Sequence, residues 1–468
     1  MMHNPETTIA APATSPGGAI SVSRLSGPDS VRIAGAIFTP RQQGFDILKA
    51  EGYTVHYGDI TDKGEILDEV LVTVFRVPHS YTGEDSVEIS CHASSFILQK
   101  IMELLINNGA SPARPGEFTQ RAFLNGRMDL SQAEAVADLI ASESEAAHRL
   151  AIHQMRGGFS KDIRTLREEL LHFASLVELE LDFSEEDVEF ADRTRLKELV
   201  KKVQGITDSL AESFQFGNAI KNGIPVAIVG KPNAGKSTLL NSILRDERAI
   251  VSEIPGTTRD AIEDTATIDG ILYRFIDTAG LRETSDLIET LGIRKTYQKI
   301  QQATVVLLLT EATDSPEVIL ESVKAIANQI SGTGKKLILV VNKTDLAGKT
   351  HLENIREALC PENEDNCIFM SALSDEDVAQ LKLLLGKKIE IERLTETSSV
   401  VTNIRHYDAL TKTSESLKRV LEGLETMVPE DLIAMDIRQA IHWLGEITGE
   451  ITTDDILTNI FKNFCIGK

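Results

Sequence analysis

Apolar and polar residues alternate in short runs through the first quarter of the chain. A period of two residues is typical of half-buried strands, and a period of three to four residues is typical of amphipathic helices. Two of the strand-like runs flank Asp62-Lys63-Gly64, a sequence that favours a tight turn. The patterns predict an α+β domain with strands at 20–27, 53–60, 65–77 and 86–90 and helices at 29–38 and 94–106.

The helical period takes over near Asp129. Ser131 followed by Glu134 has the spacing of a capping box, which predicts the start of a helix that continues to the glycine pair 157–158. Packing in a bundle is a sufficient explanation of the apolar faces that follow. The further helical regions lie at 159–216, with an acidic break at 184–192, and beyond about residue 394.

Between residues 224 and 387 the pattern changes to short, continuous apolar runs. Such runs, separated by helix-like segments, are typical of buried parallel strands with crossover helices. We therefore expect an α/β domain inserted within a helical one. The predicted domains are an N-terminal α+β domain at 1–125, a discontinuous helical domain at 126–223 and 388–468, and the inserted domain at 224–387.

The length and composition limit the class of protein. With 468 residues the chain exceeds the ~250 to 300 residues at which single cores stop growing, so two to four domains are expected. No apolar run approaches the ~20 residues of a membrane span, and four scattered cysteines suggest neither a disulfide framework nor a zinc site. These features favour a cytoplasmic protein without a membrane partner. The net charge of −23 means that an RNA partner requires a local basic patch or a second protein.

The strongest chemical signal is GKPNAGKS at 230–237, which matches GxxxxGK[ST] between a predicted strand and a predicted helix. Glycines let backbone N–H groups close around phosphates at a helix N-terminus, where the helix dipole also favours negative charge. Lys236 is expected to reach the β- and γ-phosphates, and Ser237 to bind Mg²⁺. The motif predicts a nucleoside triphosphate site.

Three further motifs follow at predicted strand ends. DTAG at 277–280 places a carboxylate near the metal and a flexible backbone beside the γ-phosphate. In NKTD at 342–345, the aspartate can accept both N–H groups of the guanine edge, whereas adenine presents the wrong pattern. SAL at 371–373 stands where a loop backbone can close over guanine O6. Together the motifs predict GTP as the nucleotide.

With GTTRD at 256–260, these motifs resemble those of the translation-factor-related GTPases. The resemblance covers nearly the whole chain, because ATSPGGAISVSRLSG, TGEDSVEISCH, ARPGEFTQRAFLNGRMDLSQAEAVADLI and the terminal FCIGK are similar to the MnmE (TrmE) family of tRNA-modification GTPases. That family has an N-terminal folate-binding domain that dimerises, a discontinuous helical domain and an inserted Ras-like G domain. The resemblance therefore implies the domain order that the apolar pattern predicts.

The resemblance also implies an activity. Members of the family work with a flavin-dependent, MnmG-like partner to add an aminomethyl or carboxymethylaminomethyl group at C5 of the wobble uridine of certain tRNAs. It implies a homodimer, a heterotetramer with that partner, and 5-formyl-tetrahydrofolate or another one-carbon folate as donor. The folate contacts carried over are Arg24, Glu88, Arg127 and Lys468. At position 127 the family pattern has Lys, whose hydrogen-bond geometry differs from that of Arg.

The terminal motif nominates Cys465 as a catalytic residue, flanked by Lys462 and Lys468. The resemblance implies a functional terminus near the folate and the substrate uridine. The alternative is a small, buried, apolar residue at a helix end.

The hydrolysis step lacks two common residues. Leu281 stands where many GTPases carry the Gln that orients water, and no arginine finger can be assigned. The resemblance nominates Glu289 to align water, although the alternative is an exposed charge on an acidic loop. It also implies K⁺ in the place of the arginine, and two G domains that face each other with K⁺ and GTP bound and separate after hydrolysis.

The remaining site residues follow from these motifs and the resemblance. The K⁺ ligands are Asn233, Ser252, Ile254 and Thr257, and the Mg²⁺ ligands are Ser237 and Thr258. The predicted GTP-binding residues are Asn233, Ala234, Gly235, Lys236, Ser237, Thr238, Ser252, Glu253, Ile254, Pro255, Gly256, Thr257, Thr258, Asp277, Thr278, Ala279, Gly280, Asn342, Lys343, Thr344, Asp345, Ser371, Ala372 and Leu373.

Two other interpretations stay open from sequence. A regulatory or ribosome-assembly GTPase switch would need an appended basic, aromatic RNA-binding module, whereas this chain has acidic helices and one Trp. A folate-sensing regulator would use the N-terminal domain without modification chemistry.

Overall fold

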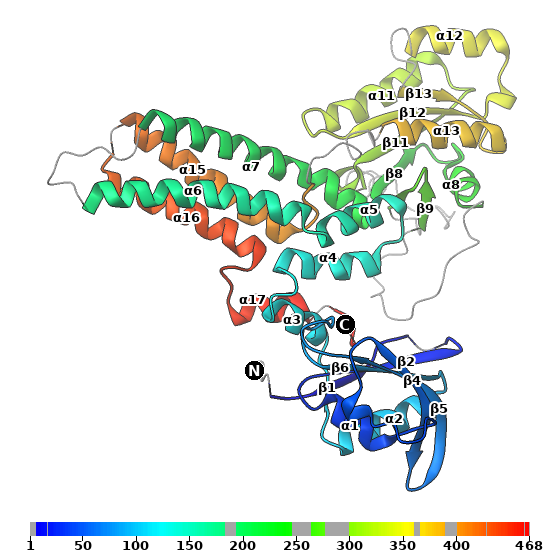
Figure 1. The fold of residues 1–468 in the computed structure, drawn as a ribbon. Helices are drawn as coiled ribbons and strands as arrows, with labels where there is room; N and C mark the ends of the chain where they lie inside the picture. The colour runs from blue at the N-terminus through cyan, green and yellow to red at the C-terminus, as the bar shows by residue number, and fades with distance from the viewer. Residues whose placement is uncertain are drawn as a thin grey trace. The chain divides into compact units, whose positions relative to one another are not determined.

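The computed structural model forms two compact units (Figure 1). One unit contains residues 1–141, 151–209 and 408–468, and the other contains 142–150 and 210–407. The predicted domain boundaries stay predictions. The structure describes residues 6–15, 17–182, 193–245, 264–276, 299–359, 366–388, 400–426, 428–462 and 464–467.

A seven-stranded sheet forms the N-terminal part of the first unit, in the order β3-β4-β5-β6-β2-β1-β7. The four predicted strands and two predicted helices of this region are all present, and three short strands and a third helix add to them. The elements are β1 (Ile9–Pro12), β2 (Ile20–Ser26), α1 (Ser30–Ile37), β3 (Phe38–Pro40), β4 (Thr54–Asp62), β5 (Glu65–Phe75), β6 (Ser86–His92), α2 (Ser95–Asn107), β7 (Ser111–Pro112) and α3 (Glu117–Leu124).

The two faces of this sheet have different coverings because side chains alternate along each strand. On β2, Leu25 belongs to the core between the sheet and helices α1 and α2. Its neighbour Arg24 therefore points to the opposite face, where Ala11 and Phe118 belong to a smaller apolar cluster. Ala11, Arg24 and Glu88 are cross-strand partners on β1, β2 and β6, so they share that face.

The helical part begins with a cap that differs from the predicted one. The amide of Gln132 donates to Asp129 Oδ1 and the amide of Asp129 donates to Gln132 Oε1, each over 2.9 Å. The predicted capping pair Ser131 and Glu134 is wrong, because both side chains are buried within the helix that this earlier pair caps. The predicted single helix up to the glycine pair is also wrong, since it is split into α4 (Leu130–Ala141) and α5 (Glu145–Met155).

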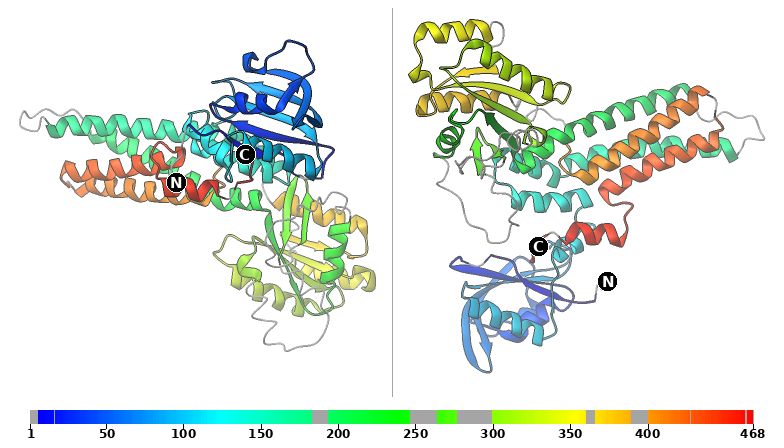
Figure 2. Two further views of the ribbon diagram at one scale, coloured as in Figure 1. Left: turned by 90° about the horizontal axis from the view of Figure 1, so that it is seen from below. Right: turned by 180° about the vertical axis from the view of Figure 1, so that it is seen from behind.

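The long helices of the chain lie side by side (Figures 1 and 2). Their buried residues recur every three to four positions, as in Phe159, Ile163, Leu166 and Leu170, so each helix turns one apolar stripe inward. The acidic break at 184–192 lies outside the described residues. The bundle consists of α6 (Gly158–Asp182), α7 (Arg193–Asn222), α15 (Ile404–Thr426) and α16 (Glu430–Thr448), and α17 (Asp454–Phe461) follows it.

The second unit is built on a six-stranded sheet in the order β13-β12-β11-β8-β10-β9. Neighbouring strands are parallel except β9 and β10, which are antiparallel. The sequence pattern did not predict β9. The elements are β8 (Ile224–Gly230), α8 (Lys236–Arg245), β9 (Asp264–Ile268), β10 (Ile271–Phe275), β11 (Val305–Glu311), α11 (Pro316–Ile330), β12 (Lys336–Asn342), α12 (Lys349–Leu359), β13 (Cys367–Phe369) and α13 (Asp375–Lys388).

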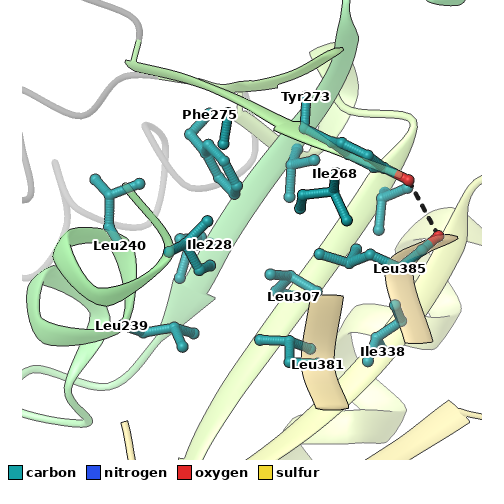
Figure 3. Packing of buried hydrophobic residues seen from close by; sticks show 14 of the residues in the cluster. Ile228, Leu239, Leu240, Ile268, Tyr273, Phe275, Leu307, Ile338, Leu381 and Leu385 are labelled. Atoms are coloured by element: carbon teal, nitrogen blue, oxygen red, sulfur yellow. Dashed lines mark hydrogen bonds between the residues drawn. The ribbon is translucent and has the colours of Figure 1, made fainter. Parts of the chain in front are cut away.

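Helices cover both faces of this sheet, as its continuous apolar runs predict. On β8, Val226 and Ile228 pack towards α8 and α13, whereas Ala227 and Val229 pack towards α11 and α12. Figure 3 shows the first of these cores, in which the buried Tyr273 hydroxyl donates to the carbonyl of Leu385 over 3.2 Å. The parallel order brings the carboxyl ends of β8, β11 and β12 to one edge of the sheet.

No helix within the described ranges is both long enough and apolar enough to cross a membrane.

Candidate functional site

The loop between β8 and α8 and the first residues of α8 together contain the predicted phosphate-binding residues 233–238. The backbone of the loop takes left-handed conformations at Asn233, with φ of 66°, and at Gly235, with φ of 97°. A Cβ at Gly235 would lie 2.3 Å from Asn342 Nδ2, so only glycine fits there. The loop therefore turns tightly into the N-terminus of α8, where backbone N–H groups have no intrahelical partner.

Lys236 folds back over this loop. Its ammonium donates to the carbonyl of Gly230 over 2.9 Å and to that of Lys231 over 2.6 Å. Burial lowers the pKa of Lys236 below its ordinary value, and the positive charge of Lys299 lowers it further. A negative ligand at the loop would relieve both effects, because it supplies a counter-charge to a partly desolvated ammonium.

Asn342, at the end of β12, joins three loops. Its Nδ2 donates to the carbonyl of Ala234 over 2.7 Å, and its Oδ1 accepts from the amide of Ala372 over 2.9 Å. The hydroxyl of Ser242 on α8 also donates to the carbonyl of Ala372, over 2.8 Å. Asn342 is only 2% exposed, so these bonds are shielded from water and fix the phosphate loop relative to the other two loops.

The predicted guanine-binding residues differ in exposure, since Asp345 is exposed, Lys343 is half-buried and Ser371 is buried. Lys343 has a left-handed φ of 65°, and its ammonium pairs with Glu311 at 2.9 Å. Asp345 follows in an exposed position, and it accepts none of the hydrogen bonds found among the described residues. The amide of Ser371 donates to Asp377 Oδ2 over 2.8 Å, which holds the turn into α13.

Thirteen predicted site residues fall outside the described part of the chain, so their placement stays a prediction. They are Ser252, Glu253, Ile254, Pro255, Gly256, Thr257, Thr258, Asp277, Thr278, Ala279, Gly280, Glu289 and Lys468.

A second candidate site lies on the N-terminal sheet and contains Arg24 and Glu88. Arg24 Nε donates to Glu88 Oε1 over 2.9 Å, and Arg24 Nη2 lies 2.8 Å from the same oxygen. The rings of Tyr81 and Phe118 lie 5.6 and 5.7 Å from the guanidinium carbon, within the range of cation–π attraction. Arg127 is exposed and adjoins Gly83, two residues beyond Tyr81 in the same loop.

A buried charge cluster holds the loop that carries Tyr81. Arg121 is fully buried, and its Nη1 donates to Glu84 at 3.1 and 3.2 Å and to the carbonyl of Thr7 at 2.9 Å. Glu84 also accepts from the hydroxyl of Ser26 over 2.7 Å. Because a buried arginine needs a counter-charge, this pair fixes the loop against α3 and β2.

The C-terminal residues reach this second site. The amide of Gly116 donates to the carbonyl of Cys465 over 3.4 Å, and Arg24 Nη1 donates to the carbonyl of Gly467 over 3.3 Å. The side chain of Cys465 is exposed, so the alternative of a buried apolar residue at a helix end does not hold. The sequence did not identify Tyr81 or Phe118, because a loop and helix α3 bring them to Arg24 from distant positions.

The comparisons with known proteins cover the whole chain. Residues 130–465 match the family described as the MnmE helical domain, and residues 8–127 match the GTP-binding protein TrmE N-terminus. The tRNA modification GTPase MnmE of Bacteroides fragilis (strain YCH46) is 53% identical over 99% of this chain and 100% of its own length. The protein of the same name from Flavobacterium johnsoniae is 51% identical over 100% of both chains.

Among solved structures, the G domain of the T. maritima FeoB iron transporter is 25% identical. It covers 35% of this chain and 97% of its own, with a TM-score of 0.25, which is too low to bear on the fold. The full-length sequence matches confirm the predicted family and the predicted combination of an N-terminal α+β domain, a helical domain and a P-loop GTPase domain. The chain belongs to the MnmE family of tRNA modification GTPases.

Proposed function

We propose that the chain hydrolyses GTP to drive modification of the wobble uridine of certain tRNAs at C5, in the cytoplasm. The product carries an aminomethyl or carboxymethylaminomethyl group, and the reaction requires a flavin-dependent partner. The chain acts as a homodimer within a heterotetramer. The observation that carries the nucleotide part is the bridge from Asn342 to Ala234 and Ala372, which supports one site shared by the phosphate and base motifs.

The chain's own residues supply binding and positioning at the nucleotide. Backbone N–H groups of the loop before α8 donate to phosphate oxygens, and Lys236 exchanges its loop carbonyls for the β- and γ-phosphates. Asp345 accepts the two guanine N–H groups, and the backbone of 371–373 closes over O6. Leu373 is 78% exposed, so its side chain is not required by the core.

The residues that would hold the metal ions fit as far as the structure describes them. Ser237 is the second residue of α8, after Lys236, and the exposed Asn233 has a left-handed backbone conformation in the loop before it. Thr258 would complete the Mg²⁺ ligands, and Ser252, Ile254 and Thr257 those of K⁺. Both ions, when bound, supply positive charge that offsets negative charge developing on the phosphates. Glu289 then aligns the attacking water.

The N-terminal site is assigned to a one-carbon folate such as 5-formyl-tetrahydrofolate. Arg24, Glu88, Arg127 and Lys468 would hold it, and the rings of Tyr81 and Phe118 fit a flat heteroaromatic group beside a carboxylate. The folate, when bound, supplies the one-carbon unit. The carbonyl contacts of the tail that carries the exposed Cys465 support the assignment of this residue to the same site.

The experiment that tests this function is the GTPase rate in KCl against NaCl at equal ionic strength. We expect strong stimulation by K⁺ that Asn233→Ala loses and the exposed helical control Asn222→Ala keeps. Equal rates in the two salts would contradict the role of K⁺ but would not contradict GTP hydrolysis by the chain. Absence of GTP hydrolysis in either salt, or an unmodified wobble uridine in tRNA incubated with GTP, folate and the flavin partner, would contradict the proposed function itself.

A further inference from the structure

A cavity of about 490 Å³ lies at the amino end of the second sheet, away from the loops of the nucleotide site. Residues from the end of α11, the start of β12 and the end of α13 line it, among them Ile330 and Leu337. Lys336 begins β12 and Asn342 ends it, so about 20 Å of strand separates the cavity from the phosphate loop. The volume lies within the ~300 to 1,000 Å³ of small-molecule sites. The cavity is therefore large enough for an organic ligand and is distinct from the nucleotide site.

Three lysines give this cavity its positive charge. Lys335 precedes β12, Lys336 is the first residue of β12, and Lys387 lies in the last turn of α13. No aspartate or glutamate within the described ranges lines the cavity with them. Like charges around one cavity raise one another's free energy, and an anion between them removes that cost. The lining therefore favours a negatively charged ligand, even though the chain has a net charge of −23.

Lys335 is fixed in place by the backbone of another segment. Its ammonium donates to the carbonyls of Gln301 and Ala303, each over 2.7 Å. An ammonium has three N–H groups, so one of them remains for a ligand. Burial lowers the pKa of Lys335, and its contacts within the described ranges include no carboxylate that would counteract this effect. An anion in the cavity would supply the counter-charge.

The lining residues favour a phosphate over a carboxylate. A carboxylate carries one charge and pairs best with the planar fork of arginine, whereas lysine ammonium groups act as compact point charges. A phosphate monoester carries ~1.5 to 2 negative charges at pH 7 and has three strong acceptor oxygens, which suit three ammonium groups. Asn366, just before β13, adds a carboxamide whose N–H groups can donate to the same oxygens.

We propose that this cavity binds the phosphate monoester of a nucleotide-sized ligand, with Lys335, Lys336 and Lys387 at the phosphate. The apolar side chains of Ile330 and Leu337 then contact the organic part of the ligand. Two sources supply this chemistry, a free mononucleotide and the phosphorylated 5′ end of an RNA. The cavity lies outside both sites described above, so its occupation does not depend on the tRNA-modification activity.

Calorimetric titration of the full-length chain with 5′-AMP tests the proposal. GDP is kept at saturation so that the phosphate loop is occupied, and adenosine serves as the ligand without a phosphate. We expect AMP to bind and adenosine not to bind. Lys336→Ala and Lys387→Ala are each expected to weaken AMP binding by roughly ten-fold, the effect of losing one charged hydrogen bond. The matched control is Lys324→Ala, which removes an exposed lysine of α11 that does not line the cavity.

Protection of lysines from acetylation gives a second measurement on the unmodified chain, so the test does not depend on the folding of a variant. Peptide mass spectrometry measures the acetylation rate of each lysine with and without AMP. Bound AMP is expected to slow acetylation of Lys336 and Lys387 and to leave Lys324 unchanged. Equal rates with and without AMP at all three lysines would overturn the proposal.

A short RNA with a 5′-phosphate, compared with the same RNA with a 5′-hydroxyl, distinguishes the two sources. Tighter binding of the phosphorylated RNA than of AMP, weakened by Lys387→Ala, identifies the ligand as an RNA end. Tighter binding of AMP identifies a free nucleotide, and either result supports the phosphate site. The proposal is overturned if neither probe binds, if adenosine binds as well as AMP, or if Lys324→Ala weakens binding as much as Lys387→Ala. None of these outcomes bears on GTP hydrolysis, because GDP occupies the phosphate loop throughout.

Discussion

The side-chain amide of Asn342 donates to the carbonyl of Ala234 over 2.7 Å, which ties the end of β12 to the phosphate loop before α8. These two residues are 108 positions apart in the sequence. The contact exists because β8, β11 and β12 are parallel neighbours, so their carboxyl ends share one edge of the sheet. Asn342 of the predicted guanine motif thereby supports the phosphate loop structurally.

Replacing Asn342 by Ala tests this dual role. The substitution leaves the buried Ala234 carbonyl and Ala372 amide without a partner, at about 1–3 kcal/mol each. We expect GTP affinity to fall by roughly ten-fold or more, measured by calorimetric titration. Asn222→Ala, an exposed asparagine in α7, is the control and should leave the affinity unchanged. Unchanged affinity in Asn342→Ala would show that the bridge is dispensable.

The pH dependence of GTP binding follows from Lys236. Burial and Lys299 hold the pKa of Lys236 low in the structure without phosphates, and bound phosphates raise it. Below the lowered pKa the lysine is protonated in both states, so its contribution to the affinity is constant there. As the pH rises through the lowered pKa, binding requires proton uptake, and affinity falls by up to about ten-fold per pH unit.

The control for this measurement is Lys236→Arg, whose guanidinium stays protonated over the whole range. The guanine ring also loses a proton in alkaline solution, and both proteins share that contribution. The difference between the two affinity profiles isolates Lys236. Parallel profiles would contradict the assigned contact between Lys236 and the phosphates.

Arg121 is expected to be essential for the stability of the N-terminal sheet. Arg121→Met removes the counter-charge of the largely buried Glu84 and one of the two arginines that pair with the buried Glu117, which keeps Arg114. Breaking a buried pair of this kind costs about 3–5 kcal/mol. We expect hydrogen exchange in β2 and β6 to accelerate by about 10² to 10⁴. Arg32→Met, which removes an exposed pair with Asp29, should leave this exchange nearly unchanged. Equal effects of the two substitutions would contradict the role of the buried cluster.

Much of the fold was predictable because its signals are local. The continuous runs of β8, β11 and β12 and the alternating runs of β4 and β5 each encode burial directly in the sequence. The start of α4 was not predictable, since two overlapping capping patterns occur within six residues. Tertiary packing decides between them, because Ser131 is buried and Asp129 also receives bonds from Ser160 and Arg164.

The two candidate sites also differ in how much of each could be predicted from the sequence. The nucleotide motif is contiguous, so residues 233–238 could be found from sequence alone, whereas the bridging role of Asn342 requires the strand order. At the second site, Tyr81, Phe118 and Gly467 come from three distant segments and meet Arg24 only through the β1-β2-β6 register and the docked tail. No periodic pattern in the sequence indicates that these residues lie close together in the fold.

The most direct test of the central claim is the base preference of the unmodified chain and of Asp345→Asn, measured as kcat/KM for GTP, ATP and XTP. A carboxylate at 345 accepts the two guanine N–H groups, whereas an amide can donate to the additional carbonyl of xanthine. The account predicts that the unmodified chain prefers GTP by on the order of 10⁴, and that Asp345→Asn reverses the preference towards XTP. Retention of the GTP preference by Asp345→Asn would contradict the assignment of this loop as the guanine-binding element.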